Sequence, residues 1–147
     1  MQALFPTYKV KTTGHSLGAA LAFMAQMSLI KDGFDTTMIN FGQPRCGDKK
    51  FAEFASAKRH DSYRVVHYKD QVPHLPPKGF LGYHHATTEA YEDLDGSVRT
   101  CDTTNGEDPT CMDQWGPLEQ SWDYHTQYLG FNMAECSYPE SASTFLQ

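Results

Sequence analysis

The chain has 147 residues, which is enough for one domain with a core of its own. Hydrophobic residues make up 39% of it and charged residues 20%, and no apolar run is long enough to cross a bilayer. The formal net charge of −6, without a basic patch, argues against a nucleic-acid partner. We therefore expect a soluble globular domain without a transmembrane segment.

The N-terminal part of the chain predicts a strand followed by a helix. Residues 8–13 (YKVKTT) are typical of a short strand that runs into Gly14. From Leu17 onward apolar residues recur at helical spacing, and Gly33 suits the left-handed position just past the helix end. The residues that share one apolar face of this helix are Leu17, Ala20, Leu21 and Met24.

Two more strands and a second helix follow. Residues 36–41 (TTMINF) predict a strand, and Asp48 suits the N-cap of a helix. The apolar face expected for that helix comprises Phe51, Phe54 and Ala55. Residues 63–69 (YRVVHYK) predict a third strand, because they are rich in β-branched and aromatic side chains.

The C-terminal half is less regular. Residues 71–85 form a loop punctuated by proline and glycine, and residues 86–92 (ATTEAYE) predict a weaker strand before a polar, acidic loop. The stretch SWDYHTQYLGF, which starts at Ser121, predicts a short helix. Strands that alternate with helices favour an α/β fold, with a mostly parallel sheet covered on both faces.

The cysteines indicate an oxidising compartment. Cys101 and Cys111 bracket the polar loop CDTTNGEDPTC, and the chain has no C-x-x-C pair of the kind that a metal site prefers. We therefore expect a disulfide between these two cysteines and no metal site. The opening MQALFPTYKV, in contrast, has no apolar core of signal-peptide length.

A possible nucleophile lies between the first strand and the first helix. Gly14, His15, Ser16, Leu17 and Gly18 form a Gly-x-Ser-x-Gly match, which is weak alone but is strengthened by its strand–turn–helix setting. A sharp turn there would expose the serine hydroxyl, with glycines where side chains would clash. The helix N-terminus would face the reacting oxygen, and the Leu17 N–H would be one oxyanion donor. The alternative is an ordinary serine cap at a helix start.

A serine needs a base, and the base needs an acid to orient it. In this architecture an acid follows a later strand and a histidine comes after it. Asp70 directly follows the clearest predicted strand, so it would stand at the same sheet edge as Ser16. Asp95, which opens a loop after an uncertain strand, is the weaker candidate.

His125 is the expected base, because it comes after all the predicted strands. His84 and His85 are the alternatives, since they lie on a loop that could line a pocket. His15 is too close to the serine along the chain to act as its base, and His67 alternates within a strand in a structural position.

Six segments of the chain, in this order, resemble the fungal-type (class 3) triacylglycerol lipases of the α/β-hydrolase fold. They are VKTTGHSLGAALA, INFGQPRCGDKKFAEF, YRVVHYKDQVPHLPP, GYHHATTEAYE, CDTTNGEDPTC and DYHTQYLG. The resemblance spans nearly the whole chain and implies Ser16 as nucleophile, Asp70 as acid and His125 as base. It agrees with the assignment made from the residues alone.

The chain also departs from the family pattern. Ala19 stands where a second glycine is usual, Cys46 where many members have valine, and Tyr124 where an aspartate often precedes the histidine. In the family roughly half of the domain, with several strands, the lid and the other oxyanion donor, precedes the serine. We therefore expect residues 1–136 to be the C-terminal part of such a domain, and residues 137–147 to be a tail.

The resemblance implies a secreted hydrolase of carboxylic esters that acts on acylglycerols at a lipid–water interface and needs no cofactor. A feruloyl-type esterase is the nearby alternative. A second alternative is a catalytically silent fragment, or a half-domain that needs a partner chain. The first strand would then be an exposed sheet edge, which invites aggregation or pairing with another chain. Cys46 and Cys136 are expected to be free.

Overall fold

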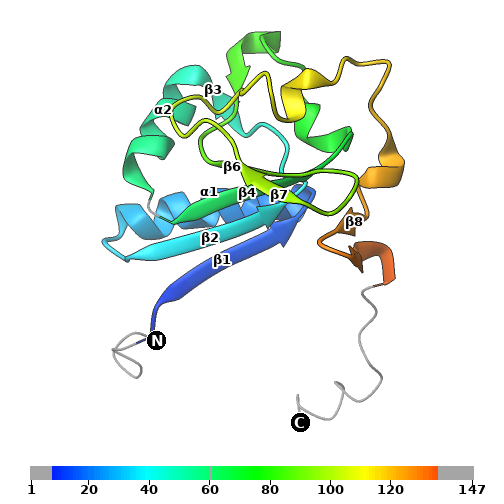
Figure 1. The fold of residues 1–147 in the computed structure, drawn as a ribbon. Coiled ribbons are helices and arrows are strands. Elements are labelled where there is room, and N and C mark those ends of the chain that lie inside the picture. The colour runs from blue at the N-terminus through cyan, green and yellow to red at the C-terminus, as the bar shows by residue number, and fades with distance from the viewer. Residues whose placement is uncertain (1–7, 60, 136–147) are drawn as a thin grey trace, which may run out of the picture.

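A five-stranded sheet organises the chain, in the order β1-β2-β4-β6-β7 (Figure 1). The structure is a computed structural model that describes residues 8–59 and 61–135. The strands of the sheet are β1 (Val10–His15), β2 (Thr36–Phe41), β4 (Ser62–His67), β6 (Glu89–Glu92) and β7 (Val98–Thr100). The first four are parallel, and β7 runs antiparallel to β6. The carboxyl ends of the parallel strands therefore meet at one edge.

Helix α1 (Leu17–Lys31) packs behind β1 and β2 (Figure 1), but not through the expected face. Its buried residues are Ala19, Phe23 and Gln26. Three residues of the expected face are exposed: Leu17 by 70%, Leu21 by 64% and Met24 by 49%. The expected face was wrong because the helix is apolar almost all the way round. The small Ala19 lets the backbone approach the sheet, where Asn40 donates a hydrogen bond of 2.7 Å to its carbonyl oxygen.

Helix α2 (Lys49–Lys58) starts as predicted, because the Asp48 carboxylate accepts a hydrogen bond of 2.8 Å from the Phe51 N–H. Its buried residues are Ala52 and Ala55, whereas Phe54 is 53% exposed, so Phe54 was wrongly placed on the buried face. Ala52 and Ala55 thus define the buried side of the helix, and Phe54 lies on its solvent side.

The rest of the chain is mostly short elements. Strands β3 (Gly47–Asp48) and β5 (Tyr83–His84) pair antiparallel, as do β8 (Gln127–Tyr128) and β9 (Phe131–Asn132). The single 3-10 turns are η1 (Val72–His74), η2 (Phe80–Gly82), η3 (Met112–Gln114), η4 (Trp122–Tyr124) and η5 (Met133–Glu135).

The prediction of a short helix from Ser121 was wrong. Only one turn, η4, forms, and the β8–β9 hairpin follows it. Leu129 (φ 51°) and Gly130 (φ 79°) both adopt left-handed backbone angles, which make a tight hairpin turn and end any helical path. The expected tail at 137–147 and Cys136, which was expected to be free, lie outside the described residues.

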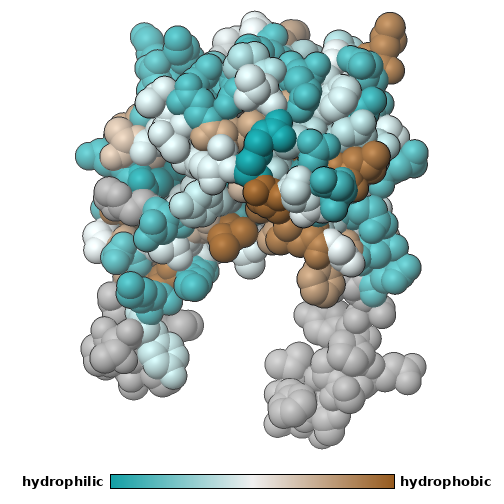
Figure 2. All heavy atoms as spheres, viewed as in Figure 1, coloured by the Kyte–Doolittle hydropathy of each residue, from teal (hydrophilic) through white to brown (hydrophobic). Residues whose placement is uncertain are grey.

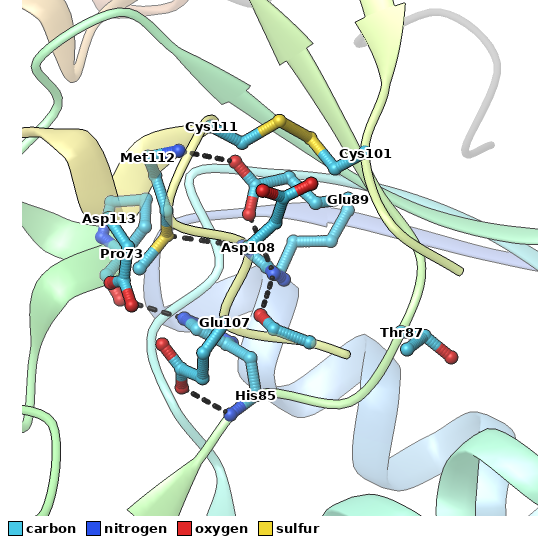
Figure 3. Close-up of polar contacts among 12 residues, drawn as sticks. Pro73, His85, Thr87, Glu89, Cys101, Glu107, Asp108, Cys111, Met112 and Asp113 are labelled. Atoms are coloured by element: carbon cyan, nitrogen blue, oxygen red, sulfur yellow. Dashed lines mark hydrogen bonds and ion pairs between the residues drawn. A yellow bond between two sulfur atoms is a disulfide. The ribbon is translucent and has the colours of Figure 1, made fainter. Parts of the chain in front are cut away.

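A disulfide joins Cys101 and Cys111, as predicted, and closes a loop above the sheet (Figure 3). Two buried ion pairs fasten this loop. Arg64 contacts Glu89 at 3.0 Å and also donates to the carbonyl oxygen of Gly106, while Arg45 contacts Glu107 at 2.7 Å. Buried charges that are paired and hydrogen-bonded in this way avoid most of the cost of an isolated charge.

The described residues do not cover both faces of the sheet, although the alternation of strands and helices predicts such cover. On the face opposite α1, Ile39 is 50% exposed and Tyr63 is 38% exposed. A hollow of about 580 Å³ lies there, lined partly by Thr13, Ile39, Phe41 and Tyr63. Figure 2 shows hydrophobic residues at the surface along the sheet and beside the C-terminal hairpin. No helix in the described part of the chain has the length and apolarity to cross a membrane.

Candidate active site

Ser16 occupies a sharp turn between β1 and α1. Its backbone angles are φ 59° and ψ −127°, an uncommon conformation for a residue with a side chain, and strain of this kind is concentrated at functional sites. The Ser16 N–H donates to the carbonyl oxygen of Phe41 at 3.0 Å, which fixes the turn to β2. The hydroxyl makes no capping bond to the helix, so Ser16 is not an ordinary serine cap.

The two glycines of the motif play different parts. A Cβ on Gly14 would lie 2.3 Å from the carbonyl oxygen of Gly18, so only glycine lets β1 and α1 approach this closely. A Cβ on Gly18 would meet no atom within 4 Å. The motif predicts that a side chain would clash at both glycines. Among the described residues this prediction is correct for Gly14 and wrong for Gly18.

Ser16, Asp70 and His125 meet at the carboxyl edge of the sheet. His125 Nε2 lies 2.8 Å from Ser16 Oγ. His125 Nδ1 lies 2.9 Å from Asp70 Oδ2 and 3.1 Å from Asp70 Oδ1. Asp70 is fully buried and His125 is 8% exposed, so water has little access to the bond between them.

The buried carboxylate dictates the tautomer of His125. An ionised carboxylate only accepts hydrogen bonds, so Nδ1 carries the proton that faces Asp70. Nε2 is then free to accept the proton of the Ser16 hydroxyl. Asp70 is itself held in place, since its Oδ1 accepts a hydrogen bond of 2.8 Å from the Val72 N–H.

The chain brings His125 to this edge through a strand-like contact beside Asp70. Ser121 forms a parallel bridge with Asp70, and its N–H donates to the carbonyl oxygen of Lys69 at 2.9 Å. The η4 turn then reverses the chain toward Ser16. The Leu17 amide lies in the first turn of α1, where N–H groups lack helical partners and can face an anion.

This site and fold match known lipases. The sequence model of the family described as Lipase (class 3) matches residues 1–80. A secreted mono- and diacylglycerol lipase of Fusarium solani is 43% identical over 106 residues, which are 72% of this chain and 31% of that protein. The chain belongs to the class 3 lipase family.

Solved structures agree with this assignment to the class 3 lipases. The Rhizomucor miehei triacylglyceride lipase superposes with a TM-score of 0.85 at 33% identity, over 92% of this chain and 53% of that one. A triacylglycerol lipase whose catalytic centre is described as a serine protease triad gives a TM-score of 0.84 at 33% identity, over the same shares of the two chains. The sheet is thus part of an α/β-hydrolase fold. The chain spans about a third of the curated relatives it matches and about half of these solved chains.

The alternative acid and bases of this class 3 lipase chain lie in other hydrogen-bonding environments. Asp95 is exposed and accepts a bond from the Ser97 N–H in a turn. His84 Nδ1 contacts the carbonyl oxygen of His85, and His85 Nε2 that of Pro73. None of these contacts involves Ser16.

Two buried histidines near the disulfide loop stay neutral. Burial, helped by the Arg45 charge, lowers the pKa of His74 to about 4. Burial, with the Arg64 and Arg45 charges, holds the pKa of His85 well below its ordinary value. Glu89, Cys101 and Cys111 come close enough to suggest a metal site, but both sulfurs are used in the disulfide.

The sequence did not single out Tyr128 or Gly42, yet both contact the site. The Tyr128 hydroxyl donates a hydrogen bond to Asp70 Oδ2. Gly42 has φ 58°, and a Cβ there would lie 3.0 Å from Asp70 Oδ2 and 3.1 Å from His125 Cε1. Tyr128 follows His125 by three residues, but that spacing becomes informative only once the hairpin is known.

Proposed function

We propose that the chain is a serine hydrolase of carboxylic esters, and that acylglycerols are its substrates. The observation that carries the proposal is the 2.8 Å contact from Ser16 Oγ to His125 Nε2, with Nδ1 of the same ring on the buried Asp70. A hydroxyl next to a neutral imidazole that is oriented by a carboxylate is equipped for nucleophilic attack.

The reaction proceeds in two steps. His125 Nε2 takes the Ser16 proton while Oγ bonds to the ester carbonyl carbon, and the Leu17 N–H faces the resulting oxyanion. His125 then gives the proton to the leaving alcohol, which leaves an acyl-Ser16. Water, deprotonated by His125, attacks that acyl group. The bond from the acyl carbon to Ser16 Oγ then breaks, His125 returns the proton to Oγ, and the carboxylic acid is released. Asp70 stabilises the imidazolium in both steps.

The surroundings of Ser16 support an apolar acyl substrate. Leu17, directly after the serine, and Leu21, one turn further along α1, are largely exposed. Trp122 is 58% exposed, with its ring centre 5.7 Å from that of His125. The named relatives act on mono- and diacylglycerols or are triacylglycerol lipases. A feruloyl ester is an alternative substrate on the same chemistry.

An active-site probe tests this function directly. We expect an alkyl 4-nitrophenyl phosphonate to add covalently to Ser16 of the purified chain, as read by intact mass and peptide mapping. We expect hydrolysis of 4-nitrophenyl butyrate and of emulsified tributyrin to disappear in Ser16→Ala. Ser28→Ala, an exposed serine of α1, is the matched control and should retain full rate. Full activity in Ser16→Ala would refute the proposal, and hydrolysis of a feruloyl ester alone would favour the alternative substrate.

A second candidate is a half-domain that is active only together with another polypeptide segment. Among the described residues, strand β1 lies at one end of the sheet, and the face opposite α1 is open. An open strand edge can pair with another chain or aggregate. Ester hydrolysis per milligram that rises with protein concentration, alongside growth in size by light scattering, would favour this candidate. A constant specific activity from a monomer would exclude it.

We also infer that the protein is secreted. The disulfide between Cys101 and Cys111 and the secreted Fusarium relative support an oxidising, extracellular environment. Cell fractionation of the source organism, with antibody detection, tests the location: recovery only from the cytosol would contradict it.

A further inference from the structure

The carboxylate that orients His125 has a second donor on the same oxygen. Tyr128, which lies in β8 and is fully buried, donates its hydroxyl proton to Asp70 Oδ2. That oxygen also faces His125 Nδ1 at 2.9 Å. The Tyr128 hydroxyl and the His125 ring therefore both donate to the same carboxylate oxygen, and together they fix its position.

The Tyr128 hydroxyl is confined to the donor role. Burial, with the negative charge of Asp70 next to it, raises the pKa of Tyr128 well above its ordinary value. At neutral pH the phenol therefore carries its proton and donates it to the carboxylate. A charge-assisted bond from a neutral donor to a buried carboxylate is among the stronger hydrogen bonds in proteins.

The Tyr128 ring is rigidly placed. It makes edge contacts with His15, Phe41 and His67, with ring centres 5.8, 5.8 and 5.9 Å away. The next residue, Leu129, donates its N–H to both carboxylate oxygens of Glu92 at 2.9 Å, which ties the hairpin to β6. The hydroxyl therefore has little freedom to follow Asp70 if the carboxylate turns.

The backbone leaves space for this hydroxyl. A Cβ on Gly42 would lie 2.8 Å from the Tyr128 hydroxyl oxygen and 3.0 Å from Asp70 Oδ2. Residue 42 also has the left-handed φ of 58°, which glycine adopts without strain. Both the turn after β2 and the C-terminal hairpin are thus shaped around the contact from Tyr128 to Asp70.

We propose that Tyr128 is a positioning residue, which holds the Asp70 carboxylate in the orientation that keeps His125 aimed at Ser16. The proposal rests on the proposed ester hydrolase function. Tyr128 acts through Asp70 and does not touch substrate, so its hydroxyl should influence kcat and leave KM nearly unchanged. Without it, Oδ2 keeps only the His125 donor and Oδ1 keeps the Val72 N–H, so the carboxylate is less firmly oriented.

The test compares Tyr128→Phe with Tyr91→Phe. Both rings are fully buried, and the Tyr91 hydroxyl accepts a bond of 2.8 Å from Trp115 Nε1 on another part of the sheet. The loss of one hydrogen bond to a charged group corresponds to about a 10–100-fold fall in kcat. We expect that fall in Tyr128→Phe, with KM within about twofold, and no fall in Tyr91→Phe.

A proton NMR measurement tests the positioning role of Tyr128 independently of the proposed ester hydrolysis. The proton shared by His125 Nδ1 and Asp70 should give a low-field proton NMR resonance, which is absent in His125→Gln. We expect Tyr128→Phe to move this resonance and Tyr91→Phe to leave it in place, even if the chain hydrolyses no ester. An unmoved resonance with unchanged kcat would overturn the positioning role. Loss of the folded state in Tyr128→Phe, or an equal fall in kcat in both variants, would also overturn it.

Discussion

His15 Nε2 donates a hydrogen bond of 2.6 Å to the main-chain oxygen of His125, and the two rings lie 4.5 Å apart. His15, which directly precedes the proposed nucleophile Ser16, thus holds the main chain of His125, the proposed base. The expectation that His15 is not the base agrees with this geometry, because its ring nitrogen is engaged with a backbone carbonyl.

His15→Leu should therefore slow catalysis without unfolding the protein. Leucine fills part of the ring volume but donates no hydrogen bond, so the His125 backbone is free to drift from Ser16. A misplacement of about 1 Å can cost on the order of 100-fold in rate. We expect a fall of 10–100-fold in kcat for 4-nitrophenyl butyrate, and a smaller fall in His15→Gln, which keeps a donor. Equal rates in wild type and His15→Leu would show that the bond has no part in catalysis.

Asp70→Asn should remove most of the activity. An amide in place of the carboxylate can donate to His125 Nδ1, which leaves Nε2 protonated and unable to accept the Ser16 proton. In a serine protease a change of this kind lowers kcat by about 10⁴-fold. Single-turnover acylation by a 4-nitrophenyl ester measures it. Asp95→Asn, in an exposed turn, is the matched control and should keep the wild-type rate. The reverse ranking would move the acid to Asp95.

Substitution of the two motif glycines by alanine should change the stability of the protein in opposite directions. Gly14→Ala places a methyl group 2.3 Å from a backbone oxygen, so β1 and α1 must separate, and a cost of several kcal/mol is expected. Gly18→Ala meets open space in α1 and should stabilise the helix by about 0.5–1 kcal/mol. Urea unfolding followed by circular dichroism checks both. Equal destabilisation by the two variants would contradict the close approach at Gly14.

Stability should fall as the pH drops through 6.5 toward 4. His74 has a pKa of about 4 in the folded chain and an ordinary value of 6.5, so in this window the unfolded chain binds more protons. The protonation of His74 alone then costs on the order of 3 kcal/mol between these two pH values. The contribution of His74 itself should level off below pH 4.

His74→Gln isolates this contribution. The variant lacks the titrating ring, so its free energy of unfolding should fall less steeply between pH 6.5 and 4. His85 changes in the same direction, because burial also lowers its pKa, and therefore part of the slope remains in the variant. Urea unfolding at several pH values gives both slopes. Parallel curves for wild type and His74→Gln would show that His74 is not buried in its neutral form.

Removal of the disulfide should destabilise the loop and, with it, the buried ion pairs. The chain-entropy model for a loop with a sequence separation of 10 gives about 3 kcal/mol of stabilisation. Replacing both Cys101 and Cys111 by serine should therefore lower the free energy of unfolding by about this amount. Cys46→Ser serves as the control for thiol loss, because Cys46 makes no disulfide among the described residues. Indistinguishable urea midpoints in all three proteins would contradict the estimate.

Several elements could be predicted because local patterns fix them. The strand at 36–41 has the predicted bounds, and the helix after Ser16 begins at Leu17 as expected. Asp48 caps α2, since a cap depends on neighbours three residues away. Asp70 and His125 could be proposed from their order along the chain, because parallel strands end at one edge.

The sequence by itself determined the order of the four parallel strands and the two helices, the elbow at Ser16 and the disulfide loop, since each depends on nearby residues or on a single spacing. Only the tertiary structure decided which face of α1 is buried, because that helix is apolar almost all the way round. The tertiary structure also brought Tyr128 and Gly42 to Asp70, across three separate segments. Long-range packing fixes such contacts, and neither periodicity nor propensity along the chain records which distant side chain a carboxylate will meet.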